Sequence, residues 1–268
     1  MNILVCIKQV PATSKVEIDQ ETGSLKRLGT QSKTNPYDLS ALETALRLRD
    51  KIGGKVTALT MGPPQAEQMM YDAYRMGVDD AVILSDRKFA GSDVLATSYT
   101  LSQGIRMLGK VDLILCGRQT TDGDTAQIGP AIAEHLGIPH AAWVDEILSV
   151  DAMGIEVRQT MAAVTQKSRL RLPCLITVEK NICVPRLPSY RLKRETAQRP
   201  IQIYGFDDLP EKNLSLCGLT GSPTHVEEMF APPSNAKRVM LKGAAGEEAA
   251  ALITVLKHKK LIEGGAVQ

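Results

Sequence analysis

Apolar and polar residues alternate along the first 140 positions in a pattern that predicts strands separated by helices. Residues 2–10 form a continuous apolar run rich in β-branched side chains, which is typical of a strand covered on both faces. Similar runs predict strands at 55–62, 80–86 and 111–117, and apolar positions with helical spacing predict helices at 35–53, 63–77, 92–109 and 131–137. Strands that alternate with helices of this length indicate parallel βαβ units with right-handed crossovers.

The pattern changes after about residue 140. Polar and apolar residues alternate through 154–161 and 162–180, which predicts antiparallel strands that close one side of the sheet. A small hairpin is expected within 14–30, turning at Glu21-Thr22-Gly23. Residues 246–262 predict a final helix with acidic residues at its start and basic residues at its end. We therefore expect an α/β fold, an open and mostly parallel sheet with helices on both faces, extra antiparallel strands and an extended C-terminal arm.

Composition and charge narrow the class of protein. The 268 residues are 43% hydrophobic and 23% charged, with a net charge of +2, which argues against nucleic acid as a default partner. No apolar run approaches the ~18 residues of a membrane span, and the first residues lack the features of a signal peptide. The five cysteines are scattered and form no CxxC pair, so we expect reduced thiols, no metal site and a cytoplasmic protein.

The stretch "CGRQTTDGDTAQIGP", residues 116–130, carries the clearest candidate chemistry. It follows a predicted buried strand and is longer than the roughly two to six residues that a connecting loop needs. In an open parallel sheet, ligands bind beyond the carboxyl ends of the strands, where this loop and the loops after Ile7, Thr60 and Leu84 lie.

The residue types of this loop favour a nucleotide. Glycines at 62, 117, 123 and 129 would allow backbone amides to approach a ligand, and the helix that begins near 126–129 would offer unpaired N–H groups to an anion. Threonines at 120, 121 and 125 could bind phosphate oxygens. Asp122 and Asp124 suit sugar hydroxyls, although Asp124 could equally be a helix N-cap.

Other motifs are absent from the sequence. It contains no GxGxxG and no GxxxxGK[ST], so neither the dinucleotide fingerprint nor the P-loop is present. Asn35-Pro36 could be only a helix start, and the four histidines favour structural or solvated roles. No nucleophile elbow, metal cluster or carboxylate pair is evident, and no residue is assigned a catalytic role. From the residues alone we expect an adenine-nucleotide-binding α/β domain with a basic tail that binds a partner.

Several motifs in order resemble the β subunit of electron-transfer flavoprotein. They are "ILVCIKQVP", "NPYD", "TMGPPQA", "MGVDDAVILSD", "CGRQTTDGDTAQIGP" and "PRLPSY", and the resemblance covers nearly the whole chain. It implies a nucleotide-binding α/β domain at 1–189 and a C-terminal arm at 190–268 that packs on a larger α subunit, which holds a flavin in a mobile domain. Ordinary members of the family bind AMP in the β subunit, whereas bifurcating members bind a second FAD there.

The resemblance assigns cofactor-binding positions residue by residue. It places Cys6 beside the adenine, Asn35 and Asp38 at the border of the nucleotide, and Met61 next to it. The residues expected around the ribose and phosphates are Asp122, Gly123, Asp124, Thr125, Gln127, Ile128 and Gly129.

The resemblance also assigns a partner-binding segment. Arg186, Leu187 and Pro188 match a loop that recognises dehydrogenases, with Leu187 as its protruding apolar residue. Prolines 185 and 188 stiffen this segment, and basic residues follow it. A solvated basic linker is the alternative interpretation of the same residues.

Departures from the ordinary family pattern favour the bifurcating branch. Ordinary members tend to have a small or neutral residue where this chain has Asp38, and an Asp where it has Gly123. FAD is then expected in place of AMP, with NADH or NAD as substrate, an acyl-CoA or lactate-type dehydrogenase as partner, and ferredoxin or flavodoxin as the low-potential acceptor. The chain would be an electron-transfer subunit of an NAD-linked oxidoreductase complex. The alternatives are an AMP-binding β subunit without bifurcation and a stress-protein-like adenine-nucleotide sensor.

Overall fold

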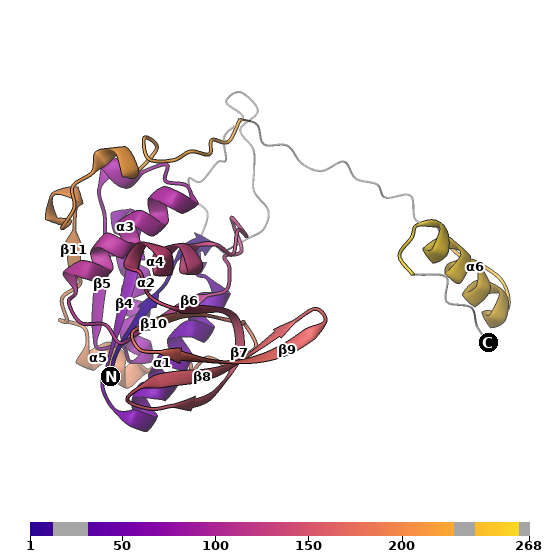
Figure 1. Ribbon diagram of the computed structural model, residues 1–268, viewed down its shortest axis with the longest axis horizontal. Helices are drawn as coiled ribbons and strands as arrows, with labels where there is room; N and C mark the ends of the chain where they lie inside the picture. The colour runs from indigo at the N-terminus through magenta and orange to yellow at the C-terminus, as the bar shows by residue number, and fades with distance from the viewer. Residues whose placement is uncertain (13–31, 228–238, 263–268) are drawn as a thin grey trace. The chain divides into compact units, whose positions relative to one another are not determined.

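A computed structural model describes residues 1–12, 32–227 and 239–262, and the chain divides into two compact units, Met1–Glu227 and Glu228–Gln268. Figure 1 shows the first unit as a central sheet with helices packed on it. The hairpin expected at Glu21-Thr22-Gly23 lies outside the described residues.

The first unit contains a nine-stranded sheet with the order β11-β5-β4-β1-β6-β10-β7-β8-β9. The strands from β11 to β7 are parallel, and β8 and β9 add antiparallel at one edge, where their hairpin projects from the sheet in Figure 1. The strands are β1 (Asn2–Cys6), β4 (Lys55–Met61), β5 (Asp80–Leu84), β6 (Leu113–Gly117), β7 (His140–Val150), β8 (Gly154–Met161), β9 (Val164–Arg171), β10 (Cys174–Val178) and β11 (Gln202–Tyr204). Two short strands, β2 (Gln9–Pro11) and β3 (Ser32–Thr34), form a separate antiparallel pair.

Helices cover both faces of the sheet, as the sequence predicts. α1 (Pro36–Ile52) and α2 (Glu67–Met76) share one hydrophobic core with the sheet, and α3 (Val94–Met107) and α4 (Ile128–Leu136) share the other. Alternate residues of β1 enter opposite cores, Ile3 the first and Leu4 the second. The shorter elements of this unit are α5 (Tyr190–Glu195), η1 (Pro64–Ala66), η2 (Arg87–Phe89), η3 (Phe206–Asp208) and η4 (Leu214–Leu216).

Local signals in the sequence account for the helix ends. α1 begins with Pro36, whose fixed φ suits the first helical position. The Asp93 side chain caps α3 by accepting hydrogen bonds from the N–H groups of Leu95 and Ala96. α2 ends at Met76, and the next residue, Gly77, has a φ of 116° and a left-handed conformation that glycine adopts without strain.

Three features of this unit differ from the sequence-based expectation, and the first is β7, for which no strand was predicted. β10, expected among the antiparallel strands, is parallel to both neighbours and lies between β6 and β7, with all five residues buried. The segment 190–227, assigned to the arm, belongs to the first unit: β11 extends the sheet beside β5, and α5 packs on α2.

The second unit contains α6 (Ala245–His258), which confirms the predicted final helix. Glu247 and Glu248 lie in its first turn, and Lys257 and His258 in its last turn, so both ends complement the helix dipole. Its apolar residues Leu252 and Ile253 are exposed.

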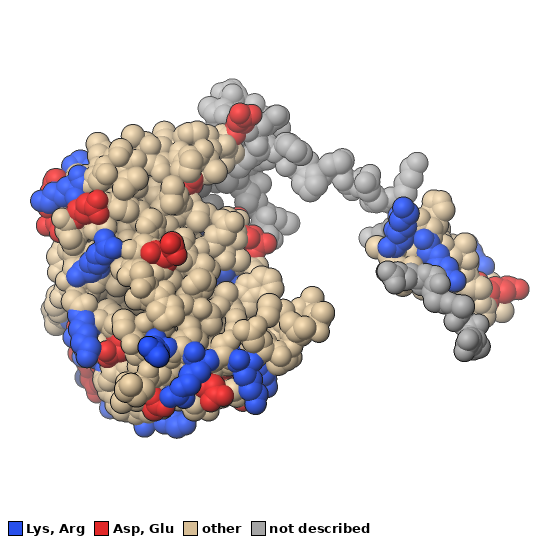
Figure 2. Space-filling view, in the orientation of Figure 1, with Lys and Arg blue, Asp and Glu red and all other residues tan. Residues whose placement is uncertain are grey.

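The surface carries charges of both signs (Figure 2), and most of the cysteine thiols lie in the core. Figure 2 shows basic and acidic side chains interspersed on the visible face of the first unit. All five cysteines are free thiols, and four of them are buried. In the described part of the chain, no helix is long and apolar enough to cross a membrane, and no cluster of three acidic, His or Cys side chains could hold a metal ion.

Candidate nucleotide site

The strand order places a crevice between β1 and β6. The chain builds β4 and β5 on one side of β1 and then returns to add β6 on the other side, so the loops after β1 and β6 diverge at the carboxyl edge. Cys6, the last residue of β1, is paired in register with Cys116, the last but one of β6. A hydrogen bond with the Cys6 thiol, together with burial, raises the pKa of Cys116 well above its usual value, so this thiol stays protonated.

The first turn of α1 closes one side of this crevice. Asn35 precedes the helix, and its backbone N–H donates to the carbonyl of Lys8 at 2.9 Å. The Asp38 carboxylate accepts from the backbone N–H of Lys8 at 2.7 Å. Gly117 makes this approach possible, because a Cβ at that position would lie 2.3 Å from Asp38 Oδ1.

Burial changes the ionisation of Asp38. Desolvation is the largest effect, and it outweighs hydrogen bonds from the Asn35 side chain and from the backbone of Lys8 and Gly117, so the pKa of Asp38 rises from 3.8 to about 7. Asp38 therefore titrates near neutral pH at the edge of the crevice.

Asn35 has an unsatisfied buried acceptor. Its side chain is fully buried, and its Nδ2 donates to the carbonyl of Gln119 at 2.8 Å. Its Oδ1 has no hydrogen-bond partner among the described residues. A buried polar atom without a partner is unfavourable by about 1–3 kcal/mol, so this oxygen fits the N–H or O–H donor of a ligand.

The loop from Arg118 to Gln127 covers the crevice from the β6 side. Lys8 Nζ forms an ion pair with Asp122 at 2.7 Å, and Asp122 in turn accepts from the N–H of Gly123 at 2.8 Å. Residues 121–125 are exposed. Asp124 and Ala126 have φ values of 53° and 56°, a left-handed conformation that costs a residue with a side chain about 1–2 kcal/mol.

The start of α4 has no side-chain cap. Its N-cap residue is Gln127, and no side chain bonds the amides of the first turn. The cap role considered for Asp124 is therefore wrong, and its carboxylate instead accepts a hydrogen bond from the Gln119 side-chain amide. The N–H groups of Ile128 and Gly129 precede Pro130, which has none, and suit a phosphate or other anion.

The two glycines of the loop, Gly123 and Gly129, differ in whether packing within the chain requires a glycine. Gly129 is buried, and a Cβ there would lie 2.3 Å from Thr177 Cγ2, so this glycine permits α4 to pack on β10. Gly123 has open space around it, with only Thr120 Oγ1 at 3.8 Å, and its φ lies outside the left-handed region. Packing within the chain therefore explains Gly129 but does not explain Gly123.

The remaining predicted residues lie around the same edge. Met61 ends β4 and is half-buried against the α3 and α4 core, as is Ile128 at the start of α4. Thr125 and Gln127 are exposed on the loop. The crevice thus gathers residues from β1, β4, α1, the 118–127 loop and α4.

Sequence reasoning missed Lys8, Gln119 and the stacking of Arg118 on Trp143. Lys8 follows β1 at the carboxyl edge, a position that could have identified it. Arg118 follows β6 in the same way, stacks on the Trp143 ring at 4.2 Å and pairs with Glu179 at 2.8 Å. Trp143 has a φ of 62°, which is a rare conformation for a bulky residue.

The predicted partner-binding residues lie on a separate surface, beside α1. We call residues 184–190 the proline segment. Leu187 at its centre is 86% exposed, and Val184 and Tyr190 are 81% and 75% exposed. The Arg186 guanidinium points back to α1, where it pairs with Glu43 at 2.7 Å and Asp50 at 3.0 Å.

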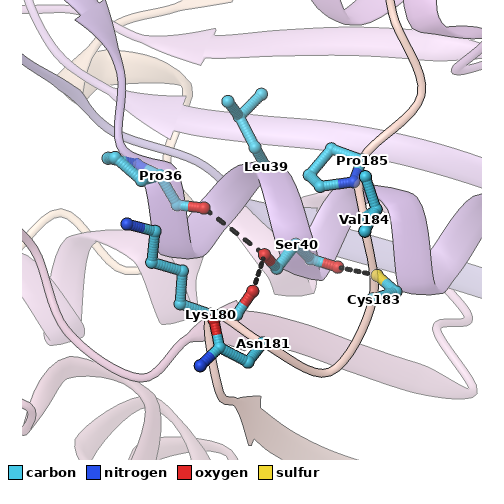
Figure 3. A pocket seen from close by; sticks show the side chains of 8 residues that line it. All are labelled: Pro36, Leu39, Ser40, Lys180, Asn181, Cys183, Val184 and Pro185. Atoms are coloured by element: carbon cyan, nitrogen blue, oxygen red, sulfur yellow. Dashed lines mark hydrogen bonds between the residues drawn. The ribbon is translucent and has the colours of Figure 1, made fainter.

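A hollow of about 530 Å³ lies between the start of α1 and the chain that leads into the proline segment. In Figure 3, the Ser40 hydroxyl lies between the carbonyls of Pro36 and Lys180, and the Cys183 thiol points to the Ser40 carbonyl. None of the predicted cofactor-binding residues lines this hollow.

Comparison with known proteins identifies the family. A family model described as the electron transfer flavoprotein domain matches residues 22–209, which is more than half of the chain. The chain belongs to the electron transfer flavoprotein family. This finding confirms the predicted resemblance.

Similar proteins in this family match along almost the whole chain. The electron transfer flavoprotein subunit beta of Clostridium acetobutylicum is 40% identical over 262 residues, 98% of this chain and all of that protein. The caffeyl-CoA reductase-Etf complex subunit CarD of Acetobacterium woodii is 43% identical over 267 residues, 98% of this chain and all of that protein. Protein FixA of Bradyrhizobium diazoefficiens is 43% identical over 262 residues, 96% of this chain and 91% of that protein.

Replacement of Asp38 by Asn should change how the stability of this flavoprotein subunit depends on pH. Because the pKa of Asp38 is raised from 3.8 to about 7, the folded chain binds the proton more tightly than the unfolded chain. Protonation of Asp38 therefore adds to the free energy of unfolding. This added stability is fully present below pH ~4 and decreases by about 1.4 kcal/mol per pH unit until pH ~7. Denaturant unfolding between pH 5 and 7 should show this decrease in the parent chain relative to Asp38→Asn. Parallel pH profiles for the two proteins would contradict the assignment.

Two glycine substitutions should separate packing from ligand contact. Gly129→Ala should lower the free energy of unfolding by about 1–3 kcal/mol, because its Cβ would overlap Thr177. Gly123→Ala should change it by less than about 0.5 kcal/mol, because space is available there. Denaturant titrations of the two variants give the comparison, and an equal loss of stability would refute the distinction.

Proposed function

We propose that this chain is the β subunit of a heterodimeric electron-transfer flavoprotein and that it binds FAD in the crevice between β1 and β6. In the proposed complex, electrons pass between NADH, a partner dehydrogenase and a low-potential acceptor such as ferredoxin or flavodoxin. The observation that carries the proposal is the unsatisfied buried Asn35 Oδ1 at the carboxyl edge of the sheet, in a chain of this family whose α4 also lacks a side-chain cap.

The residues present fit an adenine nucleotide. Asn35 Oδ1 offers a buried acceptor to a donor of the base or sugar, and the amides at the start of α4 offer donors to a phosphate. Thr125 and Gln127, which precede α4 in the chain, are exposed. A bound flavin would supply the redox chemistry by accepting a hydride and releasing electrons one at a time. The chain itself would bind and orient the nucleotide.

Two residues favour FAD over AMP. Gly123 lacks a side chain although neither its backbone nor its neighbours exclude one, which suggests that a ligand approaches it closely. Asp38 is protonated in part at neutral pH, so it can donate or accept a hydrogen bond at the edge of the crevice. An AMP-binding β subunit without bifurcation is the alternative.

The names of two relatives favour an acyl-CoA type of partner. They are the caffeyl-CoA reductase-Etf complex subunit and the acryloyl-CoA reductase electron transfer subunit gamma of Anaerotignum propionicum, which is 40% identical over 269 residues. By analogy, we propose an acyl-CoA dehydrogenase or reductase as partner in preference to a lactate-type enzyme. The C-terminal unit, with the exposed apolar residues of α6, would pack on the α subunit.

The cofactor content of the co-expressed αβ complex tests the proposed FAD site. We expect two FAD and no AMP per heterodimer. Acid extraction followed by chromatography measures both nucleotides. One FAD and one AMP per heterodimer would favour the ordinary β subunit and exclude the bifurcating proposal.

Leu187→Ala should weaken binding to the partner dehydrogenase. The side chain is 86% exposed in this chain, and its loss from an interface should cost about 1–3 kcal/mol, which is about five- to 150-fold in affinity. The matched control is Met153→Ala, another exposed apolar residue, in the turn between β7 and β8. Electron transfer should be measured across partner concentrations, and equal half-saturation for the two variants would show that Leu187 is not an anchor.

A further inference from the structure

Glu43 is a buried carboxylate that the proposed nucleotide site does not use. It lies in the second turn of α1, and it is only 3% exposed. Its carboxylate accepts hydrogen bonds from Arg47 Nε at 2.7 Å, from Arg186 Nε at 2.7 Å and from the backbone N–H of Arg186 at 3.1 Å. Glu43 is thus joined to the backbone of the proline segment, 143 residues away.

Two neighbouring contacts fix the same side of the segment. Arg47 Nη2 donates to the carbonyl of Val184 at 3.1 Å, and Arg186 Nη2 donates to Asp50 at 3.0 Å. Because Glu43 also holds Arg47, one carboxylate orients both guanidinium groups.

The other end of the segment is fixed on a different helix. The N–H of Ser189 donates to the carbonyl of Arg75 in α2 at 2.8 Å, and the Ser189 side chain caps α5. Only Leu187 and Pro188 lie between the two attachments. The chain is therefore stretched between α1 and α2 at the point where its most exposed apolar side chain projects.

The charge of Glu43 is balanced within the chain. Burial would raise its pKa, but hydrogen bonds from Arg186 and Arg47 outweigh this effect and lower the pKa, so the carboxylate stays ionised at neutral pH. A buried ion pair adds little net stability compared with apolar packing, but removal of one partner is unfavourable. A buried pair such as Glu43 and Arg186 is suited to holding the proline segment in one conformation.

We propose that Glu43 is a positioning residue that holds the proline segment ready to dock a partner protein. The segment presents Val184, Leu187 and Tyr190 to solvent. Exposed basic residues follow it at 191, 193 and 194, so the partner surface it fits is an apolar patch with an acidic rim. This inference rests on the proposed function, since it concerns the same docking surface.

Glu43→Gln in the αβ complex tests the inference directly. The change keeps the size of the side chain but removes the charge that orients Arg186 and Arg47. We expect the half-saturating concentration of an acyl-CoA dehydrogenase partner to rise about three- to tenfold, because the segment must then be ordered on binding. The maximal rate should be unchanged. Asp145→Asn, which breaks the 2.8 Å ion pair with Arg158 far from the segment in sequence, is the matched control and should have no effect.

A double-mutant cycle separates positioning from general destabilisation. If Glu43 acts through Leu187, Glu43→Gln should raise half-saturation much less in the Leu187→Ala background than in the parent complex. An equal rise in both backgrounds would overturn the inference. An effect of Leu187→Ala without any effect of Glu43→Gln would also overturn it while leaving the proposed docking surface intact. No effect of Leu187→Ala would remove the docking surface itself and the inference with it.

Arg186→Gln breaks the same ion pair at its more exposed residue. It replaces Glu43→Gln as the test of the inference if Glu43→Gln does not fold. It should produce a similar rise in half-saturation. Amide hydrogen exchange supplies an independent measurement: exchange at Arg186 should accelerate in the variant that folds, whereas the Lys193 amide, which bonds to Ser189 within α5, should keep its rate. Unchanged exchange at Arg186 would refute the positioning role.

Discussion

The close approach of α1 to the end of β6 is the constraint on which the nucleotide site depends. Gly117 permits this approach, because any Cβ there would overlap Asp38 and Tyr37. The contact buries Asn35 and Asp38 at the carboxyl edge, where backbone groups and each other supply their hydrogen-bond partners among the described residues. The ionisation of Asp38 near neutral pH and the unsatisfied oxygen of Asn35 both follow from this burial.

The same helix carries the attachment of the proline segment. Asp38 and Glu43 are five residues apart on α1, a rise of about 7.5 Å along the helix axis. A nucleotide beside Asp38 and a protein docked on the proline segment would therefore both bind to sites built on α1. This helix would fix their positions relative to each other. For a subunit whose cofactor supplies the chemistry, fixed geometry between cofactor and partner is the contribution that the protein can make.

Local signals made much of the fold predictable, and long-range pairing limited the rest. Continuous apolar runs located β1, β4, β5 and β6, and helical spacing located the four helices that cover the sheet. β10 was placed wrongly because it follows an alternating strand after a short turn, although its run "CLITV" is fully apolar as a central strand should be. Strand order depends on which edges meet in space, and a single sequence carries little information about that.

The candidate site was likewise predictable where it depends on neighbouring residues in the sequence, and not where it depends on residues far away in the chain. The loop after β6 was identifiable from its length and composition, but the partners that shape it were not, because Lys8 lies 114 residues from Asp122. Packing also accounts for Gly117 and Gly129, which composition alone suggested were ligand-facing. What packing within the chain leaves unexplained is Gly123, the Asn35 oxygen and the left-handed backbone of Asp124 and Ala126. These features lie around one crevice, and local departures from a self-consistent fold are expected where a ligand completes the structure.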